Sequence, residues 1–280
     1  MNAIHSIPFL YTLSGFAVGL LVGLTGVGGG SLMTPLLILL FGIHPATAVG
    51  TDLLYAAVTK SAGSMVHGLN RTVDWRVVRR LATGSVPMTI VTIAALSYLD
   101  IKGATAQQVI SSVLAFALLL TAVTLVFRER IIARYAPLLG TLSPNRIGVL
   151  TVVVGGVLGV LVSISSVGAG AIGVTALILL YPKLPTARIV GSDIVHAVPL
   201  TLVAGIGHWL LGSIDWQIFT ALIFGSIPGI LIGSYAAARF PETALRVVLA
   251  VTLLAVATKL SFGLIPSSSE VVAVQAISHH

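Results

Sequence analysis

The chain has 280 residues, of which 56% are hydrophobic and only 8% are charged, and it contains no cysteine. A soluble domain carries roughly 25% charged residues, so this composition excludes a soluble fold and indicates a membrane protein with several spans. Without cysteine there is no disulfide or thiolate metal site to consider. The net charge of +7 does not indicate nucleic-acid binding, because the basic residues lie in loops beside apolar segments, where Lys and Arg mark the cytoplasmic face. We expect no cofactor.

Apolar segments occur in the same order twice. In the first half we expect them at 8–27, 31–42, 46–69, 77–99 and 105–127. A basic loop at 128–146 follows, and the second half has segments at 147–166, 171–182, 186–211, 216–238 and 243–265, before a polar tail at 266–280. Runs such as 36–40 are continuously apolar, whereas strands of a membrane barrel alternate. We therefore predict an all-α polytopic membrane protein with one repeat in 1–127, a linker at 128–146 and a second repeat in 147–265.

Matching motifs show that the second half is a distant copy of the first, offset by 140 or 141 residues. The matches are Val27-Gly28-Gly29-Gly30 with Val167-Gly168-Ala169-Gly170, Gly50-Thr51-Asp52 with Gly191-Ser192-Asp193, Asp74-Trp75 with Asp215-Trp216, and Gly84-Ser85-Val86-Pro87 with Gly225-Ser226-Ile227-Pro228. Duplicated apolar halves with glycine-broken segments in corresponding places are typical of secondary transporters.

Two topologies fit the broken segments. Each could be one long span, which gives eight spans and parallel repeats, or a re-entrant hairpin followed by three transmembrane helices, which gives inverted repeats. In the hairpin arrangement the cytoplasmic segments are 70–80, 128–146, 183–188 and 239–246, and they contain 12 of the 15 Lys and Arg residues. The concentration of positive charge on one side favours inverted repeats, with both termini outside the cytoplasm.

The glycine-rich breaks predict a binding site for an anion. Adjacent glycines disfavour a continuous helix, and broken backbone inside a bilayer is tolerated where protein or a water-filled cavity surrounds it. A helix that begins at such a break presents free N–H groups and the positive end of its dipole. We predict that the substrate is lined by Gly28, Gly29, Gly30, Ser31, Gly168, Ala169 and Gly170. The alternative is close helix packing through small residues.

Ionisable residues inside predicted spans are costly and indicate function. We expect Asp52, Asp193 and His196 to bind a coupling proton or cation, and Thr51, Ser192 and Lys60 to contact the substrate. The alternatives are that the carboxylates cap helix N-termini and that the lysine reaches a water-filled crevice or the membrane interface. Asp74 and Asp215 fit helix N-caps.

Three sequences in the first half are similar to the TauE/SafE sulfite exporter family, also called TSUP. They are Gly-Leu-Thr-Gly-Val-Gly-Gly-Gly at 23–30, Thr34-Pro35-Leu36-Leu37 and Ala48-Val49-Gly50-Thr51-Asp52. The resemblance covers essentially the whole chain and implies transport of sulfite, a sulfonate such as sulfoacetate, or thiosulfate across the bacterial cytoplasmic (inner) membrane. Ala169 and Ser166 stand where the first half has Gly29 and Gly26, so the two halves need not contribute equally.

The leading hypothesis is therefore a secondary transporter, not an enzyme, that exports a small sulfur anion with a proton or cation as co-substrate. No nucleotide-binding motif of the G-x-x-x-x-G-K-[ST] type is present. The alternatives are a passive small-anion channel and an uptake permease. An intramembrane enzyme would need Ser85 or Ser14 beside His67 or His208, and no motif places such a pair together. The oligomeric state cannot be predicted.

Overall fold

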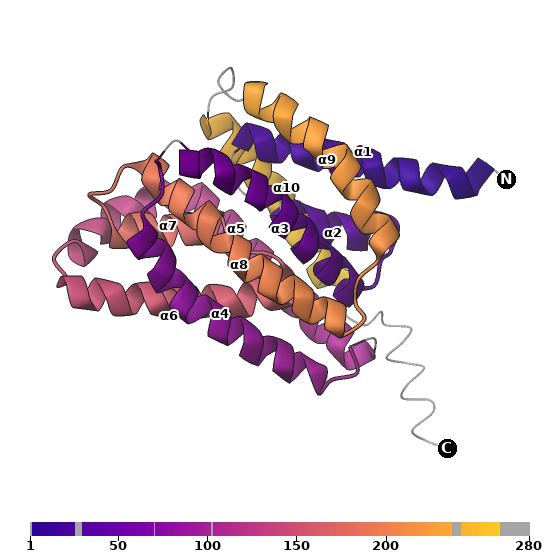
Figure 1. Ribbon diagram of the computed structural model, residues 1–280, viewed down its shortest axis with the longest axis horizontal. Helices are drawn as coiled ribbons and strands as arrows, with labels where there is room; N and C mark the ends of the chain where they lie inside the picture. Colours follow the sequence, from indigo (N-terminus) through magenta and orange to yellow (C-terminus); the bar gives the residue numbers. More distant parts are fainter. Residues whose placement is uncertain (1, 26–29, 70, 102, 237–241, 264–280) are drawn as a thin grey trace.

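The computed structural model describes residues 2–25, 30–69, 71–101, 103–236 and 242–263, and within them the only regular elements are helices. Figure 1 shows these helices packed side by side. They are α1 (Asn2–Thr25), α2 (Gly30–Phe41), α3 (Pro45–Leu69), α4 (Trp75–Ser97), α5 (Ala104–Leu139), α6 (Pro144–Ser165), α7 (Ala171–Leu180), α8 (Thr186–Leu210), α9 (Trp216–Ala236) and α10 (Glu242–Gly263). The predicted all-α fold is confirmed.

Five helices in the described part of the chain are long and apolar enough to cross a membrane, namely α4, α5, α6, α8 and the stretch Trp216–Gly233 of α9. The predicted span at 46–69 is not among them, although its counterpart α8 is. The reason lies in its composition, since α3 carries Asp52, Lys60 and His67. Because α3 packs against α2, α5, α8 and α9, these polar groups can face protein instead of lipid.

The basic segment at 128–146 is mostly helical, which corrects our expectation of a loop. α5 continues without interruption to Leu139, and α6 begins at Pro144. Its charged residues do not break the helix, because Arg and Glu are good helix formers. Charge moves a segment out of the hydrocarbon layer, but it does not end a helix.

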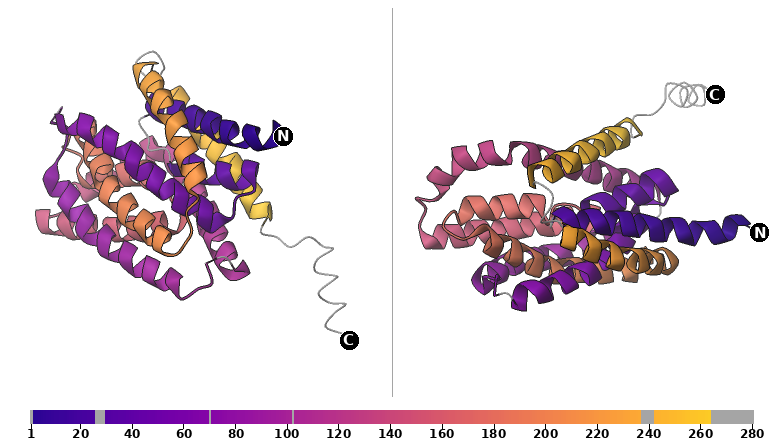
Figure 2. Two further views of the ribbon diagram at one scale, coloured as in Figure 1. Left: turned by 45° about the vertical axis from the view of Figure 1, so that its right-hand side comes forward. Right: turned by 90° about the horizontal axis from the view of Figure 1, so that it is seen from above.

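The two halves of the sequence are intertwined in the fold. α1 packs along α9 and its counterpart α6 packs along α4, so each of these pairs joins one helix from each half. Two further large contacts join counterparts directly, α3 with α8 and α5 with α10, and α4 also packs against α8. Figure 2 gives two further views of these pairs. Neither half can therefore bury its apolar surface without the other.

Glycines allow the closest of these helix contacts. A Cβ atom on Gly84 of α4 would collide with the Val152 carbonyl oxygen of α6, and one on Gly225 of α9 would collide with the Thr12 carbonyl oxygen of α1. The two glycines are counterparts in the repeat, and so are their partners. Small residues at these positions let the backbones approach, as is common between membrane helices.

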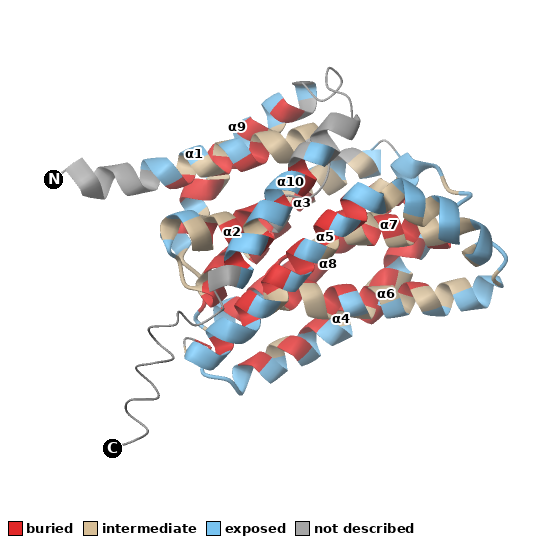
Figure 3. Cartoon of the chain, turned by 180° about the vertical axis from the view of Figure 1, so that it is seen from behind, coloured by how far each residue is buried: buried red, intermediate tan, exposed pale blue. Residues whose placement is uncertain are grey.

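α3 and α8 run antiparallel. Gly50, near the start of α3, lies against His208 near the end of α8, and Gly191, near the start of α8, lies against His67 near the end of α3. Figure 1 shows the two helices alongside each other in the centre of the molecule, and Figure 3 shows buried residues along both. The counterparts at the centre of the fold therefore point in opposite directions.

Asp74 and Asp215 are N-caps, as predicted. Asp74 Oδ1 accepts hydrogen bonds from the Arg76 and Val77 N–H groups at 3.0 and 3.3 Å. Asp215 Oδ1 accepts two equivalent bonds at the start of α9, at 2.9 and 3.0 Å. These bonds satisfy N–H groups that have no partner within the helix.

Candidate functional site

Asp52 lies on α3 in the interior and is fully buried. The Thr34 hydroxyl of α2 donates a hydrogen bond to Asp52 Oδ2 over 2.6 Å. Ser166, in the connection between α6 and α7, lies near the same carboxyl group, but its hydroxyl has no hydrogen-bond partner among the described residues. Asp52 Oδ1 has no hydrogen-bond partner among the described residues. Burying an ionised carboxylate without full pairing is expensive. This environment therefore suits the binding of a proton or a cation.

Asp193 lies on α8 at the N-terminal end of α7. The backbone N–H group of Gly170 interacts with its carboxyl group. A Cβ atom on Gly173 would collide with Asp193 Oδ1, so the carboxyl group packs directly on the first turn of α7. The N-terminus of a helix attracts negative charge. Asp193 thus occupies a place where an anionic substrate could also bind.

The second half contains the predicted break between helices. α6 ends at Ser165, α7 begins at Ala171, and the connection includes three residues in unusual backbone conformations. Ser166 has φ 58°, Gly168 has φ 126° and Gly170 has φ 115°. Only glycine adopts the last two without strain, which explains the residue type at both positions.

In the first half, the break itself lies outside the described residues, because these omit Gly28 and Gly29. Gly30 is the first residue of α2, and Ser31 is the second. The predicted roles of these residues and of Ala169 in binding substrate stay predictions.

Lys60 lies between the two carboxyl groups along the α3–α8 pair. It is 8% exposed and lies on α3 eight residues after Asp52, about 12 Å along the helix at 1.5 Å per residue. Gly63 of α3 contacts Ile194 of α8, so Asp193 lies only about one turn beyond Lys60 along the helix axis. Of the two carboxyl groups, Asp193 is therefore the nearer to Lys60 along the helix axis.

His196 lies on α8 three residues after Asp193 and is fully buried. Its Nε2 atom forms a hydrogen bond of 2.8 Å with the Ser85 hydroxyl of α4, whereas its Nδ1 atom has no partner among the described residues. In the antiparallel register His196 lies at nearly the same level as Lys60. The predicted residues Lys60, Asp193 and His196 therefore form one group, and Ser85 extends it to α4.

Thr51 and Ser192 connect the two halves. The Asp215 N–H group donates to Thr51 Oγ1 over 3.1 Å, and the Asp74 N–H group donates to Ser192 Oγ over 2.8 Å. Ser192 Oγ also donates to the Arg188 carbonyl oxygen. Both hydroxyls thus have partners without a substrate, and their predicted role in substrate binding stays a prediction.

His67 and His208 occupy separate places at the ends of the α3–α8 pair. His67 Nδ1 lies 2.9 Å from the Thr72 hydroxyl, and His208 Nε2 lies 2.9 Å from the Ser163 carbonyl oxygen. The Ser85 hydroxyl hydrogen-bonds to His196, not to either of these two histidines.

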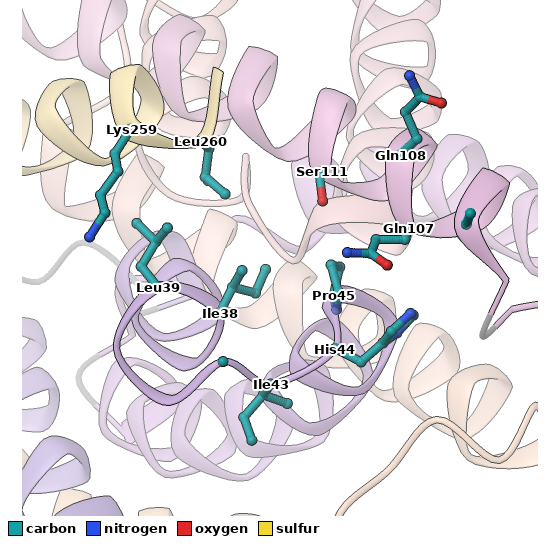
Figure 4. Close-up of a pocket in the computed structure, with 12 residues that line it drawn as sticks. Ile38, Leu39, Ile43, His44, Pro45, Gln107, Gln108, Ser111, Lys259 and Leu260 are labelled. Atoms are coloured by element: carbon teal, nitrogen blue, oxygen red, sulfur yellow. The ribbon is translucent and has the colours of Figure 1, made fainter. Parts of the chain in front are cut away.

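A cavity of about 660 Å³ lies where the α2–α3 connection meets the start of α5 and the end of α10. Figure 4 shows residues that line it, and the lining consists of Ile38, Leu39, Gly42, Ile43, His44, Pro45, Ala104, Gln107, Gln108, Ser111, Lys259 and Leu260. Both ring nitrogens of His44 are buried and lack hydrogen-bond partners among the described residues. None of the predicted site residues lines this cavity.

Sequence reasoning missed the roles of Thr34 and Ser85. Thr34 was identified only within a motif, yet its hydroxyl is the partner of Asp52. Ser85 belongs to the repeated Gly-Ser-x-Pro sequence, and that repetition was the available signal. Contacts between residues 111 apart in the chain, as for Ser85 and His196, cannot be read from spacing along one helix.

Buried carboxyl groups and a buried lysine beside a helix break, within an all-helical membrane fold, define the class of this protein as a membrane transporter. The chain belongs to the sulfite exporter TauE/SafE family, whose model matches residues 11–260.

Three relatives illustrate the similarity. A "probable membrane transporter protein" of Bacillus subtilis, YjnA, is 38% identical over 249 residues, which cover 89% of this chain and 97% of the relative. One of Xylella fastidiosa strain 9a5c is 28% identical over 237 residues, covering 81% and 84%. YdhB of Bacillus subtilis is 25% identical over 235 residues, covering 84% and 90%. No solved structure matches the chain.

Proposed function

We propose that the protein is a secondary transporter that exports a small sulfur-containing anion, such as sulfite, sulfoacetate or thiosulfate, with a proton as the co-substrate. The observation that carries this proposal is the position of Asp193, whose carboxyl group packs on the N-terminal turn of α7. Membership of the sulfite exporter TauE/SafE family supports the substrate class.

The substrate in this proposal binds at the breaks that precede α2 and α7, with Lys60 as the nearby cation. Free N–H groups at a helix N-terminus bind oxyanions without a cationic side chain. A carboxylate near these N-termini that no cation neutralises repels the substrate, whereas a protonated carboxyl group does not. Proton binding at Asp52 or Asp193 would therefore favour anion binding, which is the requirement for coupling.

We further propose inverted repeats in a bacterial inner membrane, with re-entrant segments formed by α1–α2 and α6–α7. The antiparallel packing of the counterparts α3 and α8 supports this arrangement, because helices related by an inverted repeat cross the bilayer in opposite directions. The excess of Lys and Arg in 70–80, 128–146, 183–188 and 239–246 supports a cytoplasmic location for these segments.

Binding of sulfur anions tests the substrate class directly. The purified protein in detergent is heated with sulfite, thiosulfate, sulfoacetate or chloride at equal ionic strength. A ligand of the folded state raises the melting midpoint with concentration, by a free energy of RT ln(1 + [L]/Kd). We expect a concentration-dependent rise with at least one sulfur anion and none with chloride. Equal midpoints in all four solutions would contradict the proposal.

A passive anion channel is the second candidate, since the same helix N-termini would line a pore. It is distinguished by transport, because a channel cannot accumulate an anion against its electrochemical gradient. The buried carboxyl groups with unpartnered oxygens favour the coupled transporter.

A further inference from the structure

The two carboxyl groups occupy corresponding places in the repeat, yet their surroundings differ in charge. Asp193 has the α7 N-terminus on one side, through the Gly170 N–H group, and Lys60 about one helical turn away. Asp52 has hydroxyl groups instead. Thr34 donates to it over 2.6 Å, and the Ser166 hydroxyl lies nearby without a hydrogen-bond partner among the described residues.

The asymmetry arises at one position of the repeat. The counterpart of Lys60 in the second half is Thr201, which is 1% exposed. In the antiparallel register, Gly205 of α8 packs on Leu54 of α3, so Thr201 is level with residue 58 of α3 and lies about 9 Å, between one and two turns, from the level of Asp52. At this position of the repeat, the residue toward the Asp52 end is therefore the neutral Thr201, whereas the residue toward the Asp193 end is the basic Lys60.

We propose that the carboxyl groups have different duties: Asp193 positions Lys60 and keeps it charged for the anion, and Asp52 carries the coupling proton. This inference rests on the proposed function and assigns the charges within its site. A lysine inside a bilayer protein needs a counter-charge to stay protonated, and Asp193 is its nearer carboxylate. Asp52 is farther from Lys60. The hydroxyl groups near Asp52 can hydrogen-bond both to its ionised carboxylate and to its protonated carboxyl group.

The charges then set the direction of coupling. With Asp52 protonated, Lys60 and Asp193 neutralise each other, and an arriving anion meets no net negative charge. With Asp52 ionised, the site is negative and repels the anion. Proton and anion therefore bind together and move in the same direction. Export by this coupling requires an outward anion gradient larger than the inward proton gradient, and the opposite balance gives uptake.

Other titratable groups lie near both carboxyls and are included as controls. His196 and His67 lie at the Asp193 end, on α8 and α3. Tyr55 interacts electrostatically with Asp52, and His208 packs on Gly50, two residues before it. Replacement of His67 or His208 by Gln should leave the effect of pH on anion binding in place if Asp52 is its source.

The first experiment needs no ligand. The midpoints of thermal unfolding are compared for Lys60→Met, Asp193→Asn and the double variant. Each single variant leaves one buried charge without its partner, so we expect the double variant to melt above both. Lys60→Met combined with Asp52→Asn should melt below both of its single variants. If the midpoint of the Lys60→Met/Asp193→Asn protein falls by the sum of the decreases in the two single variants, Asp193 does not position Lys60. This conclusion holds whether or not the protein transports sulfur anions.

The second experiment measures binding of thiosulfate and sulfoacetate, which keep their charge between about pH 5 and pH 8. Wild-type affinity should rise as the pH falls. Asp52→Asn should bind at every pH as tightly as the wild type does at low pH, and Asp193→Asn should bind about tenfold more weakly at the upper end of the range while retaining a pH dependence. Lys60→Arg should retain binding, whereas Lys60→Met loses it.

Three outcomes separate the possibilities. If anion binding loses its pH dependence in Asp193→Asn but not in Asp52→Asn, Asp193 carries the proton and the proposed assignment is wrong. Tighter anion binding by Asp193→Asn than by the wild type would also contradict the assignment. Asp215→Asn, a carboxyl-to-amide change at the α9 N-cap, serves as the matched control and should follow the wild-type profile. Failure of both anions to bind the wild type would count against the proposed substrate class and leave the unfolding comparison as the separate test of the Lys60–Asp193 pair.

Discussion

Thr34 Oγ1 of α2 lies 2.6 Å from Asp52 Oδ2 of α3, and this short hydrogen bond attaches α2 to a buried carboxyl group. Distances of 2.5–2.7 Å are typical of a hydroxyl bonded to an ionised carboxylate. The second half has Val174 at the corresponding position, so Asp193 has no hydroxyl donor from the equivalent position of α7.

Thr34→Val tests that bond. The change keeps the shape of the side chain but leaves Asp52 Oδ2 without its donor, and an unsatisfied buried polar group costs about 1–3 kcal/mol. We expect a loss of this size in the free energy of unfolding together with a shift in the pH dependence of transport. Thr220→Val, on the exposed face of α9, is the control. A Thr34→Val protein as stable as the control, with the wild-type pH profile, would show that the bond is dispensable.

Gly173→Ala tests the packing of Asp193 on α7. A Cβ atom at this position would meet Asp193 Oδ1, so the carboxyl group must move away from the helix N-terminus. Overpacking of this kind typically costs about 1–3 kcal/mol, and we expect anion transport to fall as well. Gly68→Ala is the matched control, because a Cβ atom there meets nothing within 4 Å. Equal transport by the two alanine variants would argue against a role for the Asp193–α7 contact.

Reporter fusions test the inverted topology. A reporter placed after Ser143, in the connection between α5 and α6, should report the cytoplasm, and a reporter at the C-terminus should report the opposite compartment. The expectation follows from an odd number of crossings in each half. Reporters in the same compartment would instead support eight spans and parallel repeats.

The sequence predicts well those parts of the structure that depend on local chemistry. Gly168 and Gly170 indicated the break because few other residues adopt their φ angles, and Asp74 and Asp215 indicated N-caps because a carboxylate accepts from the first free N–H groups of a helix. The end of α5 was placed too early, since a charged stretch leaves the membrane without ceasing to be helical.

The remaining features depend on how distant segments meet. The sequence shows that Lys60 and Asp52 share a helix, but the proximity of Lys60 to Asp193 follows from the antiparallel register of α3 and α8, which is fixed by contacts such as Gly63 with Ile194. The Ser85–His196 bond has the same origin. Such tertiary contacts have no periodic signal in a single sequence.

Proton-driven accumulation of a sulfur anion tests the central claim most directly. The purified protein is reconstituted into liposomes, and uptake of labelled thiosulfate or sulfoacetate is measured with and without an inwardly directed proton gradient, beside protein-free liposomes. A proton–anion symporter works in either orientation in the vesicle membrane, so random insertion does not hide the effect. We predict that the gradient drives the anion to a higher concentration inside than outside and that an ionophore which collapses the gradient abolishes this accumulation. Uptake that only equilibrates the anion, with the same rate and extent in the presence and absence of the gradient, would contradict proton-coupled transport.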